Sequence, residues 1–122
     1  MTTMIQDKDG VIAAAPSSVP DRHFRNAWMF DSAQTAITED ITEAKKIFQD
    51  KIRQVRGPLL DAEDVIYMKA LEADDASAKT ASVAKKKALR DAPAASAITS
   101  ADTIAKLKAA WDETVLGASP YK

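Results

Sequence analysis

The sequence predicts a mainly α-helical protein: a long kinked helical hairpin plus a short C-terminal helix, preceded by an extended or short-β N-terminal arm. Apolar residues recur at helical spacing from residue 41 onward. A Gly-Pro step interrupts this pattern without changing its phase, and the preceding residues show no helical period. We therefore divide the chain into an arm, residues 1–39, and a helical domain, residues 40–122.

The composition limits both the core and the possible functions. Of the 122 residues 46% are hydrophobic, but 24 residues are alanine, so few large side chains are available for a core. The 17 basic and 18 acidic residues are interspersed, which argues against a nucleic-acid-binding surface. No apolar run is long enough for a membrane span, and the polar, acidic N-terminus is unlike a signal peptide. We expect a soluble, intracellular protein.

The arm carries an aromatic pattern. The stretch "HFRNAWMF" would place Phe24, Trp28 and Phe30 on the same face of an extended chain, which indicates a short strand or a half-buried arm. The preceding "AAAPSSVP" is typical of a linker, because proline favours extended geometry in the residue before it. Trp28 lies in a segment too short to form its own core. It is therefore our first candidate for a partner-facing anchor.

A long helix is predicted over residues 40–72, with Thr38 or Thr42 capping its start. Residues 41–71 would span about 46 Å as one helix, whereas a compact chain of this length has a diameter of roughly 35 Å. Pro58 cannot donate to the carbonyl of Gln54, at a cost of ~3 kcal/mol in a helix interior. We expect a kink or a break at Gly57-Pro58. The apolar stripe of this helix consists of Ile41, Ala44, Phe48, Ile52, Val55, Leu59, Ala62 and Ile66.

Two further helices are predicted. The first covers residues 76–91, is capped by Asp74 or Asp75, and has an alanine-rich inner face. The second covers residues 100–115, places Trp111 in a core or an interface, and stops at Gly117. An alanine-lined helix cannot cover the whole stripe of the long helix. Apolar surface should therefore remain available for a partner.

The sequence offers little for catalysis. It has no cysteine, one histidine and three glycines, so disulfides, thiolate chemistry, most zinc sites and a phosphate-binding glycine loop are excluded. His23 is expected in a solvated loop, and the paired carboxylates are expected to cap helices and keep the chain soluble. Arg53 and Arg56 lie one turn apart and either clamp a carboxylate or carbonyl groups of a partner or remain solvated. We expect no enzyme activity, no catalytic residue, no metal site and no cofactor.

Four segments carry a resemblance to a known family: "DRHFRNAW", "IRQVRGPLLDAEDVIYMKALEADD", "VAKKKALRDAP" and "IAKLKAAWDETVLG". In this order they resemble a family of small proteins encoded beside tail and tail-fibre genes in bacteriophages and prophages. The resemblance covers residues 21–121. The turn "APAASAIT" departs from the family pattern, which often has a second proline or an acidic residue there.

The resemblance implies a non-enzymatic phage protein that binds a tail or tail-fibre protein, as an assembly accessory or chaperone or as a bound virion component. The alternative is a purely structural virion protein at a collar, fibre joint or baseplate. The protein would be located in the virion tail, or in the host cytoplasm during assembly, and could form a homo-oligomer; no nucleic acid or membrane partner is expected. The candidate partner-binding residues are Phe24, Trp28, Phe30, Arg53, Arg56, Leu59 and Trp111. Gly57 and Pro58 would form a structural kink that directs the two halves of the long helix to different surfaces.

Overall fold

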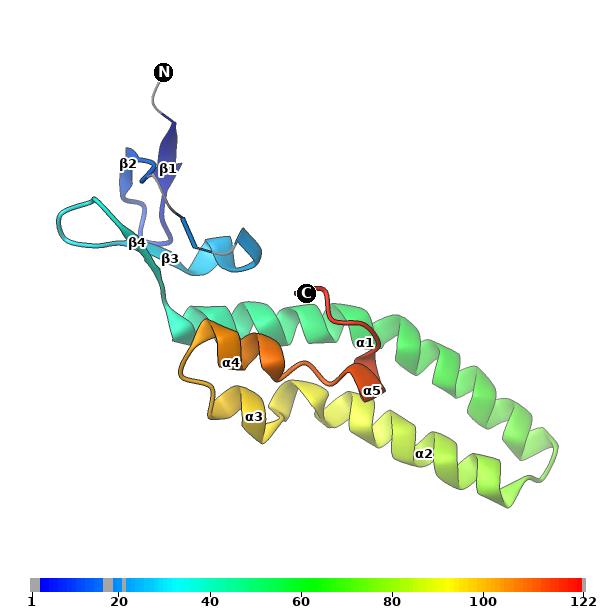
Figure 1. Ribbon diagram of the computed structural model, residues 1–122. Coiled ribbons are helices and arrows are strands. Elements are labelled where there is room, and N and C mark those ends of the chain that lie inside the picture. Colours follow the sequence, from blue (N-terminus) through cyan, green and yellow to red (C-terminus); the bar gives the residue numbers. More distant parts are fainter. Residues whose placement is uncertain (1–2, 17–18, 21, 122) are drawn as a thin grey trace.

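The computed structural model describes residues 3–16, 19–20 and 22–121, and it confirms the mainly helical fold with a long helical hairpin (Figure 1). The N-terminal part contains two antiparallel hairpins, in which β1 (Met4–Gln6) pairs with β2 (Ile12–Ala14) and β3 (Trp28–Phe30) pairs with β4 (Ile37–Glu39). A short 3-10 helix, η1 (Arg22–Ala27), precedes β3. The hairpin is formed by α1 (Ile41–Glu72) and α2 (Ala76–Asp91), which lie side by side.

The start of α1 is set by Asp40, not by either of the predicted threonines. The Asp40 carboxylate accepts hydrogen bonds from the backbone N–H groups of Thr42 at 3.0 Å and Glu43 at 3.4 Å. Thr38 belongs to strand β4, where its backbone conformation is extended, and Thr42 already lies inside the helix. A carboxylate is also favoured here because the N-terminus of a helix attracts negative charge.

The long helix continues through Pro58, and Figure 1 shows that it bends near its middle, where this proline lies. The bend has a local cause, because proline has no N–H for the carbonyl one turn earlier and its ring crowds that turn. The predicted kink is therefore present, and the alternative of two separate helices is not. Gly57 is not required by packing, since a Cβ atom there would meet nothing within 4 Å.

The connection between α1 and α2 is a tight turn. The N–H of Asp75 donates to the carbonyl of Ala70 at 2.9 Å, and the N–H of Asp74 donates to that of Leu71 at 3.2 Å. This pair of hydrogen bonds is the Schellman motif, with Asp74 at φ +52° in the position that usually holds glycine. Asp75, one of the two predicted caps, starts α2 by accepting from the N–H of Ala78 at 3.1 Å.

The prediction of one continuous helix over residues 100–115 is wrong, because two separate short helices occupy this range. The chain after α2 forms η2 (Ala92–Ala94), α3 (Ser96–Thr99), α4 (Ile104–Ala109) and α5 (Glu113–Leu116). Thr103 and Asp112 each cap a new helix start, since their side chains accept backbone N–H groups of the following turn. The indole of Trp111 donates to the carbonyl of Gly117 at 3.0 Å, which folds the last turn back on itself.

The main core joins the first half of α1 to the end of α2, to η1 and to the C-terminal helices. The ring of Tyr121 stacks on both Phe24 and Phe48 at 5.3 Å between centroids, so the C-terminal segment connects η1 to α1. The core is made of Phe24, Ala27, Ala44, Phe48, Ile52, Leu89, Ile98, Ala101, Leu107, Trp111 and Leu116. It extends along α1 only as far as Leu59 and Leu60, which pack against its edge.

The arm contains the predicted short strand, β3, but not all of the three aromatic residues lie in it. Phe24 lies at a kink within η1, where its backbone is not helical (φ −112°, ψ 28°), and its side chain enters the main core. Trp28 instead forms a second, smaller core with Ile5 and Ile37. Trp28 and Phe30 therefore share one face of β3, as predicted, whereas Phe24 does not belong to that face. The predicted linker is also partly structured, because Ala13 and Ala14 belong to β2; residues 17–18 of that linker lie outside the described residues.

Replacing Gly57 with alanine should increase the free energy of unfolding by about 0.5–1 kcal/mol, because alanine is a better helix former and has room there. Urea unfolding followed by circular dichroism measures this change. The matched control is Gly117→Ala, which also has space around the added Cβ but sits at φ +84°. That substitution should destabilise by roughly 1–3 kcal/mol. Equal effects of the two substitutions would contradict the explanation.

Candidate functional site

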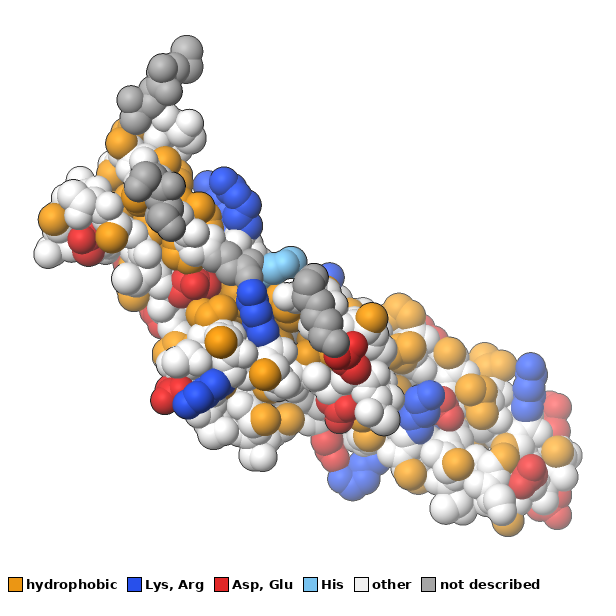
Figure 2. Space-filling view, viewed as in Figure 1, with side chains coloured by type: hydrophobic (Ala, Val, Ile, Leu, Met, Phe, Trp, Pro, Cys, Tyr) orange, Lys and Arg blue, Asp and Glu red, His pale blue; other side chains and the backbone are white. Residues whose placement is uncertain are grey.

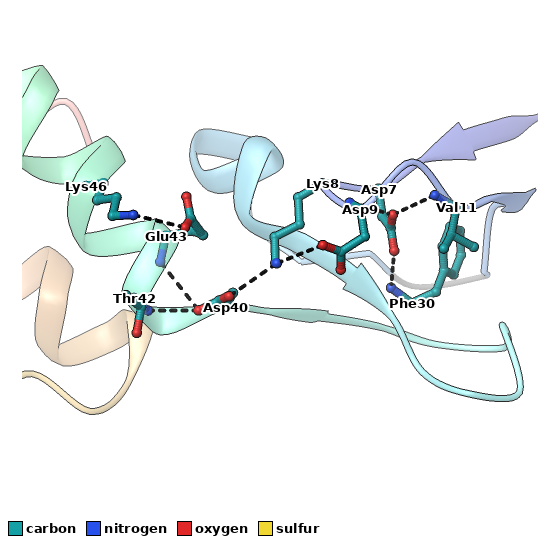
Figure 3. A network of polar contacts seen from close by, with 9 residues as sticks. All are labelled: Asp7, Lys8, Asp9, Val11, Phe30, Asp40, Thr42, Glu43 and Lys46. Atoms are coloured by element: carbon teal, nitrogen blue, oxygen red, sulfur yellow. Dashed lines mark hydrogen bonds and ion pairs between the residues drawn. The ribbon is translucent and has the colours of Figure 1, made fainter.

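A cleft of about 510 Å³ lies where the arm meets the start of α1. It is polar, with charges of both signs, and is lined by Gln6, Asp7, Lys8, Asp9, Arg25, Asn26 and Glu43. Asp7 belongs to the framework of the arm, because its carboxylate accepts the backbone N–H groups of Asp9 and Val11 at 2.9 Å and of Phe30 at 3.0 Å (Figure 3). It thereby holds the turn of the first β-hairpin against the second.

Lys8 extends this network to the helical domain (Figure 3). Its ammonium group lies 3.1 Å from the carboxylate of Asp9 and 3.4 Å from that of Asp40, the residue that caps α1. The hydrogen bond to Asp9 and, next, the one to Asp40 raise the pKa of Lys8 against the effect of desolvation. These contacts position the arm relative to α1.

Two further clefts differ from the first in the residues that line them. One of about 430 Å³ contains His23, whose ring meets that of Tyr121 edge to face at 5.0 Å. A recess of about 240 Å³ between α1, α2 and the C-terminal helices is mostly apolar, with four alanines in its lining and Asp91 and Asp112 as its polar residues. Within the described residues no group of three or more acidic or histidine side chains is arranged to hold a metal ion. None of the helices in the described part of the chain has the length and apolar character needed to cross a bilayer.

Three of the predicted partner-binding aromatics are buried. Trp28 is 1% exposed, Phe24 0% and Trp111 6%, so none of them presents a surface to a partner. The expectation for Trp28 is corrected for a physical reason: two short hairpins close over its ring, and the guanidinium groups of Arg22 and Arg25 lie 5.9 and 5.7 Å from the ring centroid. Phe30 is half-buried at the edge of the same small core.

The two arginines predicted to bind a partner, Arg53 and Arg56, have different surroundings. Arg53 pairs with Asp50 at 2.8 Å on the surface of α1. Arg56 donates to the carbonyl of Arg90 at 2.8 Å, near the end of α2. The expected carbonyl contact of Arg56 therefore occurs within the chain, where it stabilises the end of α2. Gln49 and Lys45 donate in the same way to carbonyls of Pro93 and Thr99.

The part of the hairpin beyond the main core has an unusual interior. We call residues 59–72 of α1 and 76–86 of α2 the distal hairpin. The buried residues here are Glu63, Ala70 and Ser82, at 5%, 5% and 1% exposure. Ser82 donates to the carbonyl of Glu63 at 3.3 Å, and the carboxylate of Glu63 lies 3.9 Å from the ammonium group of Lys85. The two helices are thus held together by small and polar groups.

The outer surface of the distal hairpin is apolar instead. Its exposed large side chains are Val65 at 54%, Ile66 at 48%, Met68 at 54%, Leu71 at 48% and Val83 at 51%. Figure 2 shows hydrophobic side chains spread over this end of the molecule. Among the described residues outside the distal hairpin, the large apolar side chains with comparable exposure are Met4 and Ile12 of the first β-hairpin. The distal hairpin is therefore the best candidate for a protein-binding surface.

Two faces of this surface lie on either side of the inward-facing Glu63 and Ala70, while Val65 and Met68 lie on the outer side of α1 between them. Successive helical residues are rotated by about 100°. Leu59, Ala62 and Ile66 therefore lie on one side of α1, which we call the Ile66 face. Tyr67 and Leu71 lie on the other side together with Val83 of α2, and we call this the Leu71 face. Leu59 is the predicted partner-binding residue that belongs to the distal hairpin, and it is half-buried.

The burial of Glu63 is not indicated by the sequence pattern. The apolar stripe of α1 points into the main core through Phe48 and Ile52, but Ile66 at its distal end is half exposed. The bend at Pro58 changes the direction of the second half of α1, so α2 meets a different set of its side chains. Lys85 and Lys86 belong to a basic run of three lysines, and they pair with Glu63 and Asp64 across the hairpin, so this run is a sequence signal for acidic partners on α1.

Comparison of the chain with protein-family models, with curated protein sequences and with solved structures found no match.

The Asp7 carboxylate should make the arm sensitive to acid. The hydrogen bond from Phe30, followed by those from Val11 and Asp9, lowers the pKa of Asp7 below its ordinary value of 3.8, although desolvation opposes the shift. The stabilisation is therefore complete above the unfolded pKa and is lost as the pH falls below 3.8 through the folded pKa. In an NMR titration, the indole signal of Trp28 should change in this range before that of Trp111.

The Asp7→Asn variant should destabilise the arm already at pH 7, because an amide cannot accept all three N–H groups. It should also remove the dependence of the arm's stability on acidic pH. Asp9→Asn is the control, because the Asp9 side chain accepts a hydrogen bond from Lys8 at the surface. It is Asp7 that accepts from Phe30 in the second β-hairpin. An Asp7→Asn protein with the acid response of the unchanged chain would show that another group controls the arm.

Proposed function

We propose that this chain is a non-enzymatic phage protein that binds a tail or tail-fibre protein, either as an assembly accessory or as a bound component of the virion. The observation that carries the binding role is the distal hairpin, whose interior is small and polar while its larger apolar side chains face outward. The phage context is supported by the resemblance of residues 21–121 to small proteins encoded beside tail and tail-fibre genes.

Burial of the distal hairpin against a partner would be favourable in free energy. Full burial of a Val, Ile or Leu side chain contributes about 1.5–3 kcal/mol relative to full exposure, and five large side chains here are only about half buried. A partner helix lying on the hairpin would recover much of this contribution. Two helices joined by small and polar contacts gain little from their own interface, so a third element adds both stability and specificity.

The Ile66 face is the proposed contact for the tail protein. It continues the stripe that enters the main core through Ile52, so it lies next to the rigid part of the molecule. Leu59 packs against the edge of that core, Ala62 is small enough to let a second backbone approach, and Ile66 offers a half-exposed anchor. A helix or strand of a tail protein would be held there by apolar contact.

Ile66→Gln should weaken binding to the tail-fibre protein encoded beside this chain by roughly tenfold, because a half-exposed anchor contributes about 1–2 kcal/mol. Co-expression followed by affinity purification and calorimetry measures the effect. Leu71→Gln is a matched control, since Leu71 has the same 48% exposure on the same helix but lies on the other face. A tail protein that binds both variants as tightly as the unchanged chain would rule out this contact.

Pro58→Ala should straighten α1 and change the affinity for the tail protein, because the bend sets the direction of the distal hairpin relative to the main core. Circular dichroism should show increased helicity, and calorimetry should show weaker binding. Gly57→Ala, which keeps the proline, is the control and should leave binding intact. If Pro58→Ala leaves stability, oligomeric state and partner binding unchanged, the bend has no part in recognition.

Mass spectrometry of purified particles and of crude lysate separates the two forms of the proposal. A fixed copy number per particle indicates a bound virion component. Presence in lysate and absence from particles, together with improved solubility of the co-expressed fibre, indicates an assembly chaperone. A purely structural collar, joint or baseplate protein is indicated by a fixed copy number without any effect on fibre solubility.

A further inference from the structure

We infer that the Leu71 face is a self-association surface, on which the distal hairpin of a second copy packs to form a four-helix bundle. This face lies opposite the one proposed for the tail protein, so the inference goes beyond that function and does not depend on it. The occupant follows from the arrangement of apolar residues and charges on the two helices.

The position of the Leu71 face is fixed by contacts between the two helices. The ammonium group of Lys86 on α2 lies 4.8 Å from the ring centroid of Tyr67 on α1 and 2.6 Å from the carboxylate of Asp64. Leu71 is one turn beyond Tyr67, and Val83 is one turn before Lys86. Leu71 and Val83 therefore flank this cross-helix contact on the same side of the hairpin, and both are about half exposed.

Both helices present this face with the spacing of a helical bundle. The face of α1 contains Leu60, Asp64, Tyr67 and Leu71, separated by four, three and four residues. The face of α2 contains Ala76, Lys79, Val83, Lys86 and Arg90, separated by three, four, three and four residues. Alternation of three and four keeps a seam in line along a pair of packed helices. Along the seam the larger apolar side chains Leu60, Tyr67, Leu71 and Val83 are interspersed with Asp64 on α1 and with basic residues on α2.

The charges of the hairpin select a second copy as the occupant. Residues 59–75 contain six acidic residues and one basic residue, whereas α2 contains five basic residues and one acidic residue. A helix that docks on the basic face of α2 must be amphipathic and acidic. The distal part of α1 has both properties, and a second copy supplies it. Two-fold symmetry then repeats the contact, because α1 of each copy lies on α2 of the other.

Several of these charges remain available for a contact between copies. Lys86 and Lys79 are engaged within the hairpin, by Asp64 and Asp74. Asp61 and Glu72 on α1 and Arg90 on α2 are exposed and make no ion pair with another described side chain. Lys87 is 72% exposed and pairs only with Asp91 on its own helix. The pairing of copies would therefore place acidic residues of one α1 beside basic residues of the other α2.

The first test is sedimentation velocity over a concentration series, with the full chain at low and high salt. We expect a monomer–dimer equilibrium that salt weakens. Leu71→Gln should weaken dimerisation by roughly tenfold or more, because the residue occurs twice in the interface. Ile66→Gln, at equal exposure on the other face, should leave it unchanged. A monomer at every concentration, or equal effects of the two variants, would overturn the inference.

The second test reverses charges and identifies which helices meet. One variant carries Asp61→Lys and Glu72→Lys on α1, and the other carries Lys87→Glu and Arg90→Glu on α2. Each variant alone should dimerise more weakly, because like charges then face each other twice. An equimolar mixture should form the mixed dimer at least as well as the unchanged chain, since both contacts again join opposite charges. Circular dichroism confirms that each variant is folded.

The outcomes separate this inference from the proposed function. A mixture that dimerises no better than the single variants overturns the pairing of α1 with α2, even if the tail protein still binds. Conversely, a mixed dimer that forms as expected supports the pairing even if no tail protein binds. A protein that dimerises only through another face would retain its dimer in the Leu71→Gln variant, which also overturns the inference.

Discussion

The length of α1 is the constraint on which the rest of the structure depends. A helix of 32 residues spans about 48 Å, whereas the large side chains of the main core reach along it only to Leu59 and Leu60. The first half of α1 therefore belongs to a packed domain, with η1 and the C-terminal helices around it. The second half has α2 as its neighbour. Pro58 lies at the division and gives the two halves different directions.

The arm is attached to this helix by polar contacts more than by apolar area. Its small core of Ile5, Trp28 and Ile37 is separate from the main core. Asp7 ties the two β-hairpins together, and Lys8 reaches Asp40, which at the same time starts α1. Phe24 and Tyr121 supply the apolar part of the junction. The position of the arm is thus linked to the same helix end that begins the long hairpin.

The distal hairpin connects the fold to the proposed roles. An interior of Glu63, Ala70 and Ser82 keeps the two helices close and narrow, so the larger apolar residues are left on both sides. The same narrowness gives two separate faces on one short hairpin. A tail protein on the Ile66 face and a second copy on the Leu71 face could then be bound together, and the protein would act as a connector between chains.

The sequence by itself determined the elements that depend on local chemistry: the apolar repeat predicted the long helix, Pro58 its bend, Asp75 the start of α2 and Gly117 the last stop. The tertiary structure decided what each side chain meets. Trp28 became buried because two hairpins close over it, and Phe24 entered the main core through a kink in η1 that its alternation with Trp28 did not indicate. Thr103 and Asp112 divided the predicted third helix, because capping and the contact of Trp111 with Gly117 compete with helical propensity.

Of the candidate site, the sequence predicted that apolar surface would remain, whereas its location depended on the bend that turns Glu63 inward and Ile66 outward. Periodicity fixes which residues share a face, but only the packing of distant segments fixes which face is covered.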